Sequence, residues 1–323
     1  MTMATLSPID ERLLLNAAVA APSVHNTQPW LFRVSDGRVD LLADRTRQLR
    51  EQDPEGRALL VSCGAALLNL RVATEHVGYE PHVELLPDPD EPDLMARVAI
   101  DGHHTRAGMT AELFNAIEQR HTNRMPYEDR PVPRPVLDAL VEAARQEGAE
   151  LHVVTDPHDR ARLVDLIHEA DLTHETNAAR IDEAQHWTGV GEQRTDGVPA
   201  QALGPLPSTA DTPFRDLTLG RSVPGRAFAV FEKDPTLAVL TTRGDDRLAW
   251  LVAGQALERV LLVATVEGLV STFANQPLEM PSLRWLVRDP DAPIGYAQMI
   301  MRLGYAPPAP ATPRRPLDEV VLH

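Results

Sequence analysis

Residues 21–30, APSVHNTQPW, connect an apolar segment that predicts a helix, residues 9–20, to one that predicts a strand, residues 31–34. Pro22 ends the helix because its ring does not fit a helix interior, and Pro29 favours an extended conformation at Gln28. The side chains between the prolines are mostly short and polar. This composition fits an ordinary helix-to-strand turn, and it also fits a loop that holds a flat polar ligand.

Composition limits the classes of protein to consider. The chain has 323 residues, of which 43% are hydrophobic and 24% charged, as in globular proteins with one large or two smaller domains. No run of apolar residues predicts a membrane span and the N-terminus does not resemble a signal peptide, so we expect a cytoplasmic protein. The formal net charge of −16 argues against binding to nucleic acid or to an anionic membrane. Cys63 is the single cysteine and is expected in the core.

The order of predicted elements repeats along the chain. Strands at residues 31–34, 39–42, 83–86 and 95–100 surround a long helix at 53–76. A helix at 135–146 and strands at 151–155, 237–241 and 298–303 surround a second long helix at 245–267. With an offset of 190 the long helices share Arg57/Arg247, Gly64/Gly254, Ala66/Ala256, Leu67/Leu257 and Gly78/Gly268. We interpret this as an internal duplication of an α+β unit.

Two arginine-rich segments are candidates for binding an anion. Arg120, Thr122 and Arg124 alternate in a short polar segment, where two arginines could hold a phosphate from one side. Arg314 and Arg315 lie between two prolines, which would fix them in place. Each segment could instead be a solvated, charged surface.

These segments resemble the nitroreductase family, and specifically its Acg-like subfamily. Residues 21–30 are similar to the family's flavin-contacting loop, and residues 120–124 are similar to its R-x-S/T-x-R motif, with Asn123 where the subfamily often has Asp. The segment 271–279 resembles the strand and loop whose backbone faces flavin N5. The resemblance implies FMN as cofactor, bound by Pro22, Ser23, His25, Asn26, Gln28, Arg120, Thr122, Arg124, Asn275, Gln276, Arg314 and Arg315.

The resemblance also implies an architecture, a nitroreductase-like α+β fold in which one chain mimics the family's homodimer. The first half would be residues 1–108 and the second residues 109–323, with a lid-like insertion at 170–235 that contains a W…GVPA segment typical of the subfamily. The second-half counterpart of the opening loop has no Pro, Ser or Asn. We therefore expect one FMN per chain and a monomer that acts as an intramolecular pseudo-dimer.

The implied activity is an oxidoreductase that uses NAD(P)H to reduce nitro- or quinone-like acceptors by hydride transfer through flavin N5. The flavin carries this chemistry, so no catalytic side chain and no metal are predicted. The alternative is a catalytically silent protein that stores flavin beneath the lid. A flavin-free interaction protein is a third possibility, in which the arginines would be surface residues.

Overall fold

The computed structural model describes residues 6–35, 37–103, 109–174, 176–191, 193–208, 216–287 and 295–322. The first half contains α1 (Pro8–Val19), β1 (Trp30–Ser35), β2 (Arg38–Ala43), α2 (Arg57–His76), β3 (Tyr79–Leu85) and β4 (Leu94–His103). Its four strands pair antiparallel in the order β1-β2-β4-β3. The helix α3 (Met109–Gln119) follows and packs against both α2 and the second long helix.

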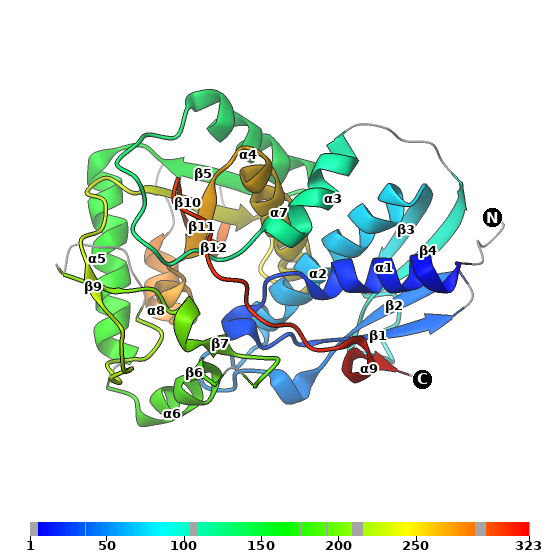
Figure 1. The fold of residues 1–323 in the computed structure, drawn as a ribbon, viewed down its shortest axis with the longest axis horizontal. Coiled ribbons are helices and arrows are strands. Elements are labelled where there is room, and N and C mark those ends of the chain that lie inside the picture. The colour runs from blue at the N-terminus through cyan, green and yellow to red at the C-terminus, as the bar shows by residue number, and fades with distance from the viewer. Residues whose placement is uncertain are drawn as a thin grey trace.

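The second half has the same plan. It contains α4 (Arg134–Gln146), β5 (Glu150–Val154), β10 (Thr236–Thr242), α7 (Arg247–Val266), β11 (Val270–Phe273) and β12 (Tyr296–Gly304). The strand order is β5-β10-β12-β11, which corresponds strand for strand to the first sheet, and a long helix follows the second strand in each half. The predicted α+β fold is confirmed, and its topology agrees with the interpretation of a duplication. Figure 1 shows the two halves side by side with α2 and α7 between them.

The insertion lies between β5 and β10. It holds α5 (Pro157–His174), α6 (Ala178–Trp187) and the short strands β6 (Thr188–Val190), β7 (Val198–Pro199), β8 (Leu206–Pro207) and β9 (Phe228–Ala229). The predicted insertion at 170–235 therefore begins inside α5 and not in a loop. Four short helical segments, α8 (Pro281–Arg284), η4 (Gln276–Glu279), η5 (Trp285–Val287) and α9 (Leu317–Val320), complete the second half and the tail.

The C-terminal tail crosses from the second half back to the first (Figure 1). It ends in β13 (Val321–Leu322), which pairs parallel with β1 so that Val321 lies opposite Phe32. The last residues thus extend the sheet of the first half. A division of the chain at residue 108 separates the two repeated units but does not separate two independent structures.

The two long helices cross at a pair of glycines. A Cβ atom placed on Gly64 of α2 would overlap the carbonyl oxygen of Leu251 and would lie 2.9 Å from Cα of Gly254. A Cβ atom on Gly254 of α7 would overlap the carbonyl oxygen of Val61. The obstacles are backbone atoms that cannot rotate away, so only glycine permits this close approach. The matched glycines in the sequence mark the contact between the two halves.

The start of α2 differs from the prediction. The helix begins at Arg57 and not at Asp53, because Gly56 has a left-handed backbone (φ 78°). The carboxylate of Asp53 stays outside the helix and accepts hydrogen bonds from the backbone N–H groups of Ala58 (3.0 Å) and Leu59 (2.9 Å). It thereby caps the first turn. Cys63 in the same helix is fully buried, as predicted.

The sequence analysis expected no apolar segment long enough to span a membrane. The length and composition of two helices contradict this expectation. Within the described residues, α2 and α7 are each long and apolar enough for a bilayer. In the structure 83% of the apolar window of α2 and 72% of that of α7 are buried inside the protein, where the helices pack on each other and on the sheets. Their hydrophobicity is explained by the core they form.

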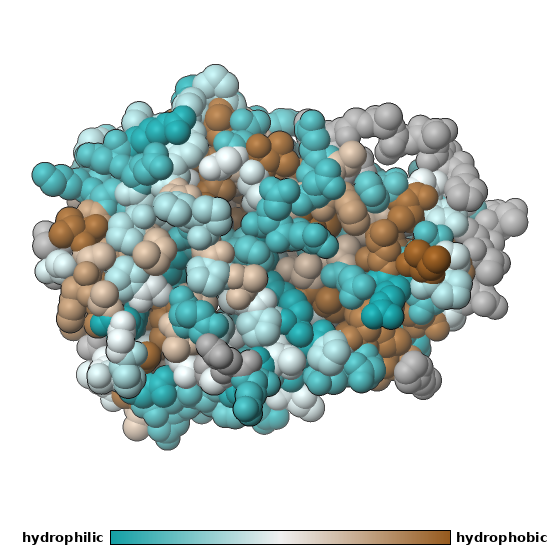
Figure 2. Space-filling model, viewed as in Figure 1, coloured by the Kyte–Doolittle hydropathy of each residue, from teal (hydrophilic) through white to brown (hydrophobic). Residues whose placement is uncertain are grey.

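The outer surface is mostly hydrophilic on the face shown in Figure 2. Hydrophobic residues on this face gather on the side of the first half, near α1, which carries the 78% exposed Ile9. Hydrophilic residues predominate on the rest of this face, in agreement with the 24% of charged residues in the chain.

Candidate functional site

A pocket lies between the two halves, where the opening loop meets the long helices and the strand β11. Six residues that the sequence analysis predicted for the site line it: Pro22, Ser23, His25, Thr122, Arg124 and Asn275. Thr122 is placed by a β-bridge to Ser271, and the backbone N–H of Asn123 donates to the carbonyl oxygen of Ser271 (2.8 Å). The structure thus joins three segments far apart in the sequence.

The opening loop is strained. His25, Asn26 and Gln28 have positive φ angles of 47°, 55° and 51°, a backbone region that side chains other than glycine rarely adopt. Each such residue costs of order 1 kcal/mol or more, and such conformations cluster at functional sites. The surrounding contacts hold this shape: the Ser23 hydroxyl accepts from the N–H of Gln28 (2.9 Å), and the Ser62 hydroxyl accepts from the N–H of Val24 (3.2 Å).

Asn26 and Gln28 do not line the pocket. The amide nitrogen of Asn26 donates to the carbonyl oxygens of Gly197 (2.9 Å) and Pro313 (3.1 Å). The amide nitrogen of Gln28 donates to the carbonyl oxygen of Thr195 (2.8 Å). The opening loop therefore holds both the insertion and the C-terminal tail against the first half. We call the side chains of Asn26 and Gln28, which make these hydrogen bonds, the clamps.

Two arginines meet beside the pocket without lining it, Arg120, which is buried, and Arg314, which is partly buried. Nη2 of Arg120 (3.2 Å) and Nη2 of Arg314 (3.0 Å) donate to the same carbonyl oxygen, that of Ala20. Ala20 stands two residues before Pro22, which lines the pocket. The Nε atoms of both arginines and Nδ1 of His121 are buried without a hydrogen-bond partner. We call Arg120, His121, Glu258 and Arg314 the arginine cluster.

The cluster has an excess of positive charge. Glu258 of α7 is fully buried, and its carboxylate lies 3.5 Å from Nε of Arg120. Burial raises the pKa of Glu258 to about 7, partly opposed by the charge of Arg120. Burial, and then repulsion from Arg120, lowers the pKa of Arg314 to about 9, and burial with both arginines lowers the pKa of His121. One carboxylate balances two guanidinium groups, so an added anion would be stabilised here.

Arg315 and Gln276 do not line the pocket. The backbone N–H of Arg315 donates to Oε1 of Gln28 (2.7 Å), and its Nη2 donates to the carbonyl oxygen of Glu319 (2.8 Å). Gln276 is fully buried and donates to Oδ2 of Asp171 (3.2 Å). Both side chains hold chain segments together. The adjacent arginines Arg314 and Arg315 thus have different environments. The sequence could not show this difference, because the two side chains are chemically identical.

Sequence reasoning missed several residues of the pocket wall. Arg57 and Ser62 of α2, Phe273, Glu279 and Met299 line it, and Leu217 reaches it from the insertion. Arg57 belongs to the repeated pair Arg57/Arg247, which was the one available signal. It donates to the carbonyl oxygen of Gln298 (2.6 Å), and burial lowers its pKa to about 10.

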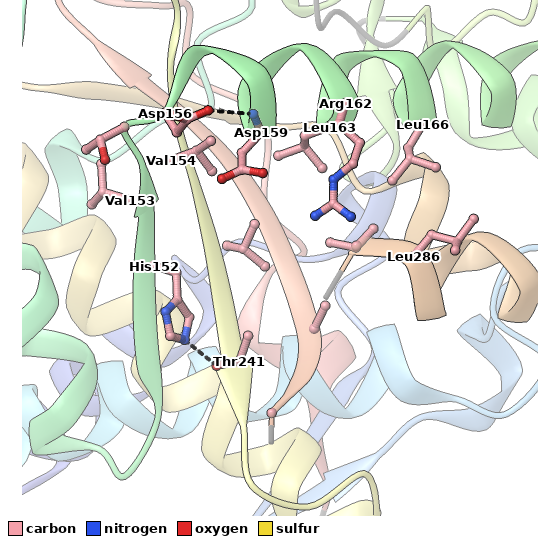
Figure 3. Close-up of a pocket in the computed structure, with 15 residues that line it drawn as sticks. His152, Val153, Val154, Asp156, Asp159, Arg162, Leu163, Leu166, Thr241 and Leu286 are labelled. Carbon is pink, nitrogen blue, oxygen red and sulfur yellow. Dashed lines mark hydrogen bonds between the residues drawn. The ribbon is translucent and has the colours of Figure 1, made fainter. Parts of the chain in front are cut away.

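A different pocket lies on the second half, between α5 and the sheet of β5, β10 and β12 (Figure 3). Its polar residues include His152, Asp159 and Arg162, and His152 makes a hydrogen bond with Thr241 (3.1 Å). None of the residues predicted for the site lines it. We therefore assign the functional site to the pocket between the halves.

The fold and pocket define an α+β protein with an arginine-flanked site between two similar halves. The sequence model of the Nitroreductase family matches residues 117–305, which is more than half of the chain. A Mycobacterium tuberculosis protein provisionally named NAD(P)H nitroreductase Rv3131 is 36% identical over 96% of this chain and 90% of its own length. The provisionally named nitroreductase acg of the same organism is 32% identical over 99% of this chain and 96% of its own. The chain belongs to the nitroreductase family.

Solved structures give weaker likenesses. The FMN- and NADPH-dependent nitroreductase NfnB of a Sphingopyxis strain is 17% identical over 65% of this chain and 98% of its own, with a TM-score of 0.40. A Bacteroides fragilis nitroreductase with bound FMN is 18% identical over 64% of this chain and 94% of its own, with a TM-score of 0.39.

Proposed function

We propose that this chain binds one FMN in the pocket between its halves and acts as an NAD(P)H-dependent oxidoreductase on nitro- or quinone-like acceptors. Family membership supports an oxidoreductase in general. The observation that carries the proposal is the arginine cluster, whose buried, unpartnered donors and excess positive charge adjoin a pocket between two similar halves. A phosphate-bearing planar cofactor fits both features.

The residues present fit FMN. Arg120 and Arg314 would hold the phosphate, because both Nε–H groups are buried donors without a hydrogen bond, although the carboxylate of Glu258 lies 3.5 Å from Nε of Arg120. Thr122, Arg124 and Asn275 line the pocket, and their polar groups would hydrogen-bond the ribityl chain and the ring edges. When bound, the flavin supplies hydride chemistry, and the protein supplies position and charge.

A second candidate function, storage of flavin without turnover, is favoured by one observation. Leu217 of the insertion lines the pocket, and the clamps Asn26 and Gln28 fasten the insertion at Gly197 and Thr195. A fastened insertion over the ring would slow the approach of a reductant. The two functions differ in whether a bound flavin is reduced by NAD(P)H.

The test is an anaerobic absorbance spectrum of the FMN-reconstituted protein before and after NADPH or NADH. Fast bleaching supports the oxidoreductase. A flavin spectrum that persists with NAD(P)H but bleaches with dithionite supports storage. Failure to take up FMN at all contradicts both.

Two neighbouring arginines give a matched pair for the phosphate site. Arg314→Ala removes a charged donor of the cluster and is expected to raise the Kd of FMN about 10- to 100-fold, from the worth of one charge-assisted hydrogen bond. Arg315→Ala makes the same change one residue away, where the partners are Gln28 and Glu319, and is expected to change the Kd by less than about threefold. Equal losses in both variants would contradict the assigned phosphate site.

The proposal includes a monomer in the cytoplasm, with one cofactor per chain. The matching strand order of the two sheets supports a monomer in which the two halves of one chain take the places of two subunits. Sedimentation of the FMN-loaded protein together with its flavin-to-protein ratio tests this part.

A further inference from the structure

A groove adjoins the pocket. It shares four lining residues with the pocket, Val24, Arg57, Ala58 and Glu279, so these residues form a common wall of the two spaces. The groove runs between the segment before α2, at Asp53 and Glu55, and the segment around α8 and η5. The groove therefore lies beside the place assigned to the flavin.

The insertion does not line this path. Among residues 188–208 and 216–235, the described parts of the insertion after α6, none borders the groove, although Leu217 borders the pocket. The hydrogen bonds that hold the insertion at Thr195 and Gly197 come from the opening loop, through Gln28 and Asn26. These described parts of the insertion can therefore stay fastened without covering the groove.

The charged groups of the groove favour some ligands over others. Its lining contains two arginines, Arg57 and Arg284, and four carboxylates: Asp53, Glu55, Asp245 and Glu279. Arg284 forms a bidentate pair with Asp245 (2.8 and 2.6 Å), and Arg57 donates to backbone carbonyls. Asp245 is thus paired with Arg284, and Glu279 lies 3.7 Å from Nη1 of Arg180, which leaves Asp53 and the exposed Glu55 against Arg57. The remaining charge of the lining is negative and both of its guanidinium groups are already engaged, so the groove is poorly suited to an anion.

Two aromatic side chains border the groove near the surface. Trp285 is 64% exposed and Tyr296 is 39% exposed, which is unusual for rings of this size in a chain with only 4% aromatic residues. Exposed aromatic rings bind flat aromatic ligands by stacking, and they attract cations to their faces. Aromatic rings next to excess carboxylate give the groove a preference for ligands that are flat and not negatively charged.

We propose that this groove is the route by which flat aromatic substrates reach the flavin pocket, and that it selects cationic and uncharged ones over anionic ones. The inference rests on the proposed function for what happens to the substrate in the pocket. The binding preference itself depends only on residues of the groove.

The first experiment measures binding to the flavin-free protein through quenching of tryptophan fluorescence. The probes are the para-nitrobenzyl trimethylammonium cation, para-nitrobenzyl alcohol and para-nitrobenzoate, which differ mainly in charge. The cation is expected to bind about tenfold tighter than the anion at low salt, with the alcohol between them, and added salt should reduce the difference. Equal affinities, or tightest binding of para-nitrobenzoate, would overturn the inference.

Three variants locate the binding in the groove. Trp285→Phe should remove most of the quenching signal, because the other tryptophans lie outside the groove. Glu55→Gln should reduce the ratio of cation affinity to anion affinity about twofold. Glu51→Gln makes the same change on an exposed residue outside the lining and should leave this affinity ratio unchanged. A ratio lowered equally by both variants would show a general effect of net charge and would contradict the groove.

The FMN-loaded protein separates this inference from the proposed function. If FMN is not taken up but the probes bind in the expected order, the groove preference stands and the cofactor assignment fails. If FMN binds and is reduced but the acceptors show no charge order in KM, the cofactor assignment stands and the groove inference fails.

Discussion

Replacing Gly64 by alanine tests the close contact between α2 and α7. A Cβ atom at this position would overlap the carbonyl oxygen of Leu251 and lie 2.9 Å from Cα of Gly254. Since ordinary contacts to a Cβ are longer than about 3.4 Å and backbone atoms cannot rotate away, the helices must separate by roughly 0.5–1 Å.

The expected loss of stability follows from two opposing terms. Overpacking at a rigid site costs about 3 kcal/mol, at the upper end of the usual range. Alanine is favoured over glycine within a helix by about 1 kcal/mol. The net loss is about 2 kcal/mol, which for a chain of this length lowers the Tm by roughly 3 °C.

The assay is thermal unfolding of the flavin-free protein followed by circular dichroism. Gly102→Ala is the control, since Gly102 has no heavy atom within 4 Å of an added Cβ, and it should change the free energy of unfolding by less than about 0.5 kcal/mol. The double variant with Gly254→Ala should lose less than the sum of the single losses, because the first substitution already separates the helices. A Gly64→Ala protein as stable as the unchanged one would refute the reasoning.

Two further predictions concern the clamps and the arginine cluster. Asn26→Ala removes the hydrogen bonds to Gly197 and Pro313 and should lower the free energy of unfolding by about 1–3 kcal/mol. It should also speed limited proteolysis within residues 188–208, and an unchanged cleavage rate would contradict the role of Asn26 in fastening the insertion. Burial raises the pKa of Glu258 to about 7, so the folded protein binds a proton there more tightly than the unfolded chain does, and stability should fall as the pH rises from about 5 to about 7. Asp53, with a pKa raised by burial to about 6, acts in the same direction. Glu258→Gln should make the decline in the free energy of unfolding over this range smaller, by on the order of 1–3 kcal/mol, and an unchanged pH dependence would contradict the role of Glu258.

Much of the fold could be predicted from the sequence because its signals are local. Prolines and apolar periodicity placed α1, β1 and β2 within a residue or two, and the matched residues of the two long helices indicated the repeated plan. The sequence analysis began α2 too early, at Asp53. The left-handed backbone of Gly56 and the hydrogen bond from Ala58 to the carboxylate of Asp53 set the true start, and neither can be read from the residue types alone. The apolar length of α2 and α7 likewise did not reveal that they bury each other.

The candidate site was only partly predictable. The sequence identified the polar loop and the arginine segments, since dense hydrogen-bonding groups and charges in an otherwise acidic chain are visible without coordinates. It could not distinguish Arg314 from Arg315, because adjacent side chains with the same chemistry point to different surroundings only after the tail has crossed to the first half.

What the sequence by itself determined is therefore the set of elements, their repeated order and the presence of anion-binding groups, all of which follow from local patterns. Tertiary structure alone decided which groups meet. The two long helices meet at Gly64 and Gly254, Arg120 is buried beside Glu258, and Asn26 hydrogen-bonds the insertion at Gly197. These are long-range contacts, and their energies depend on distances that no local pattern encodes.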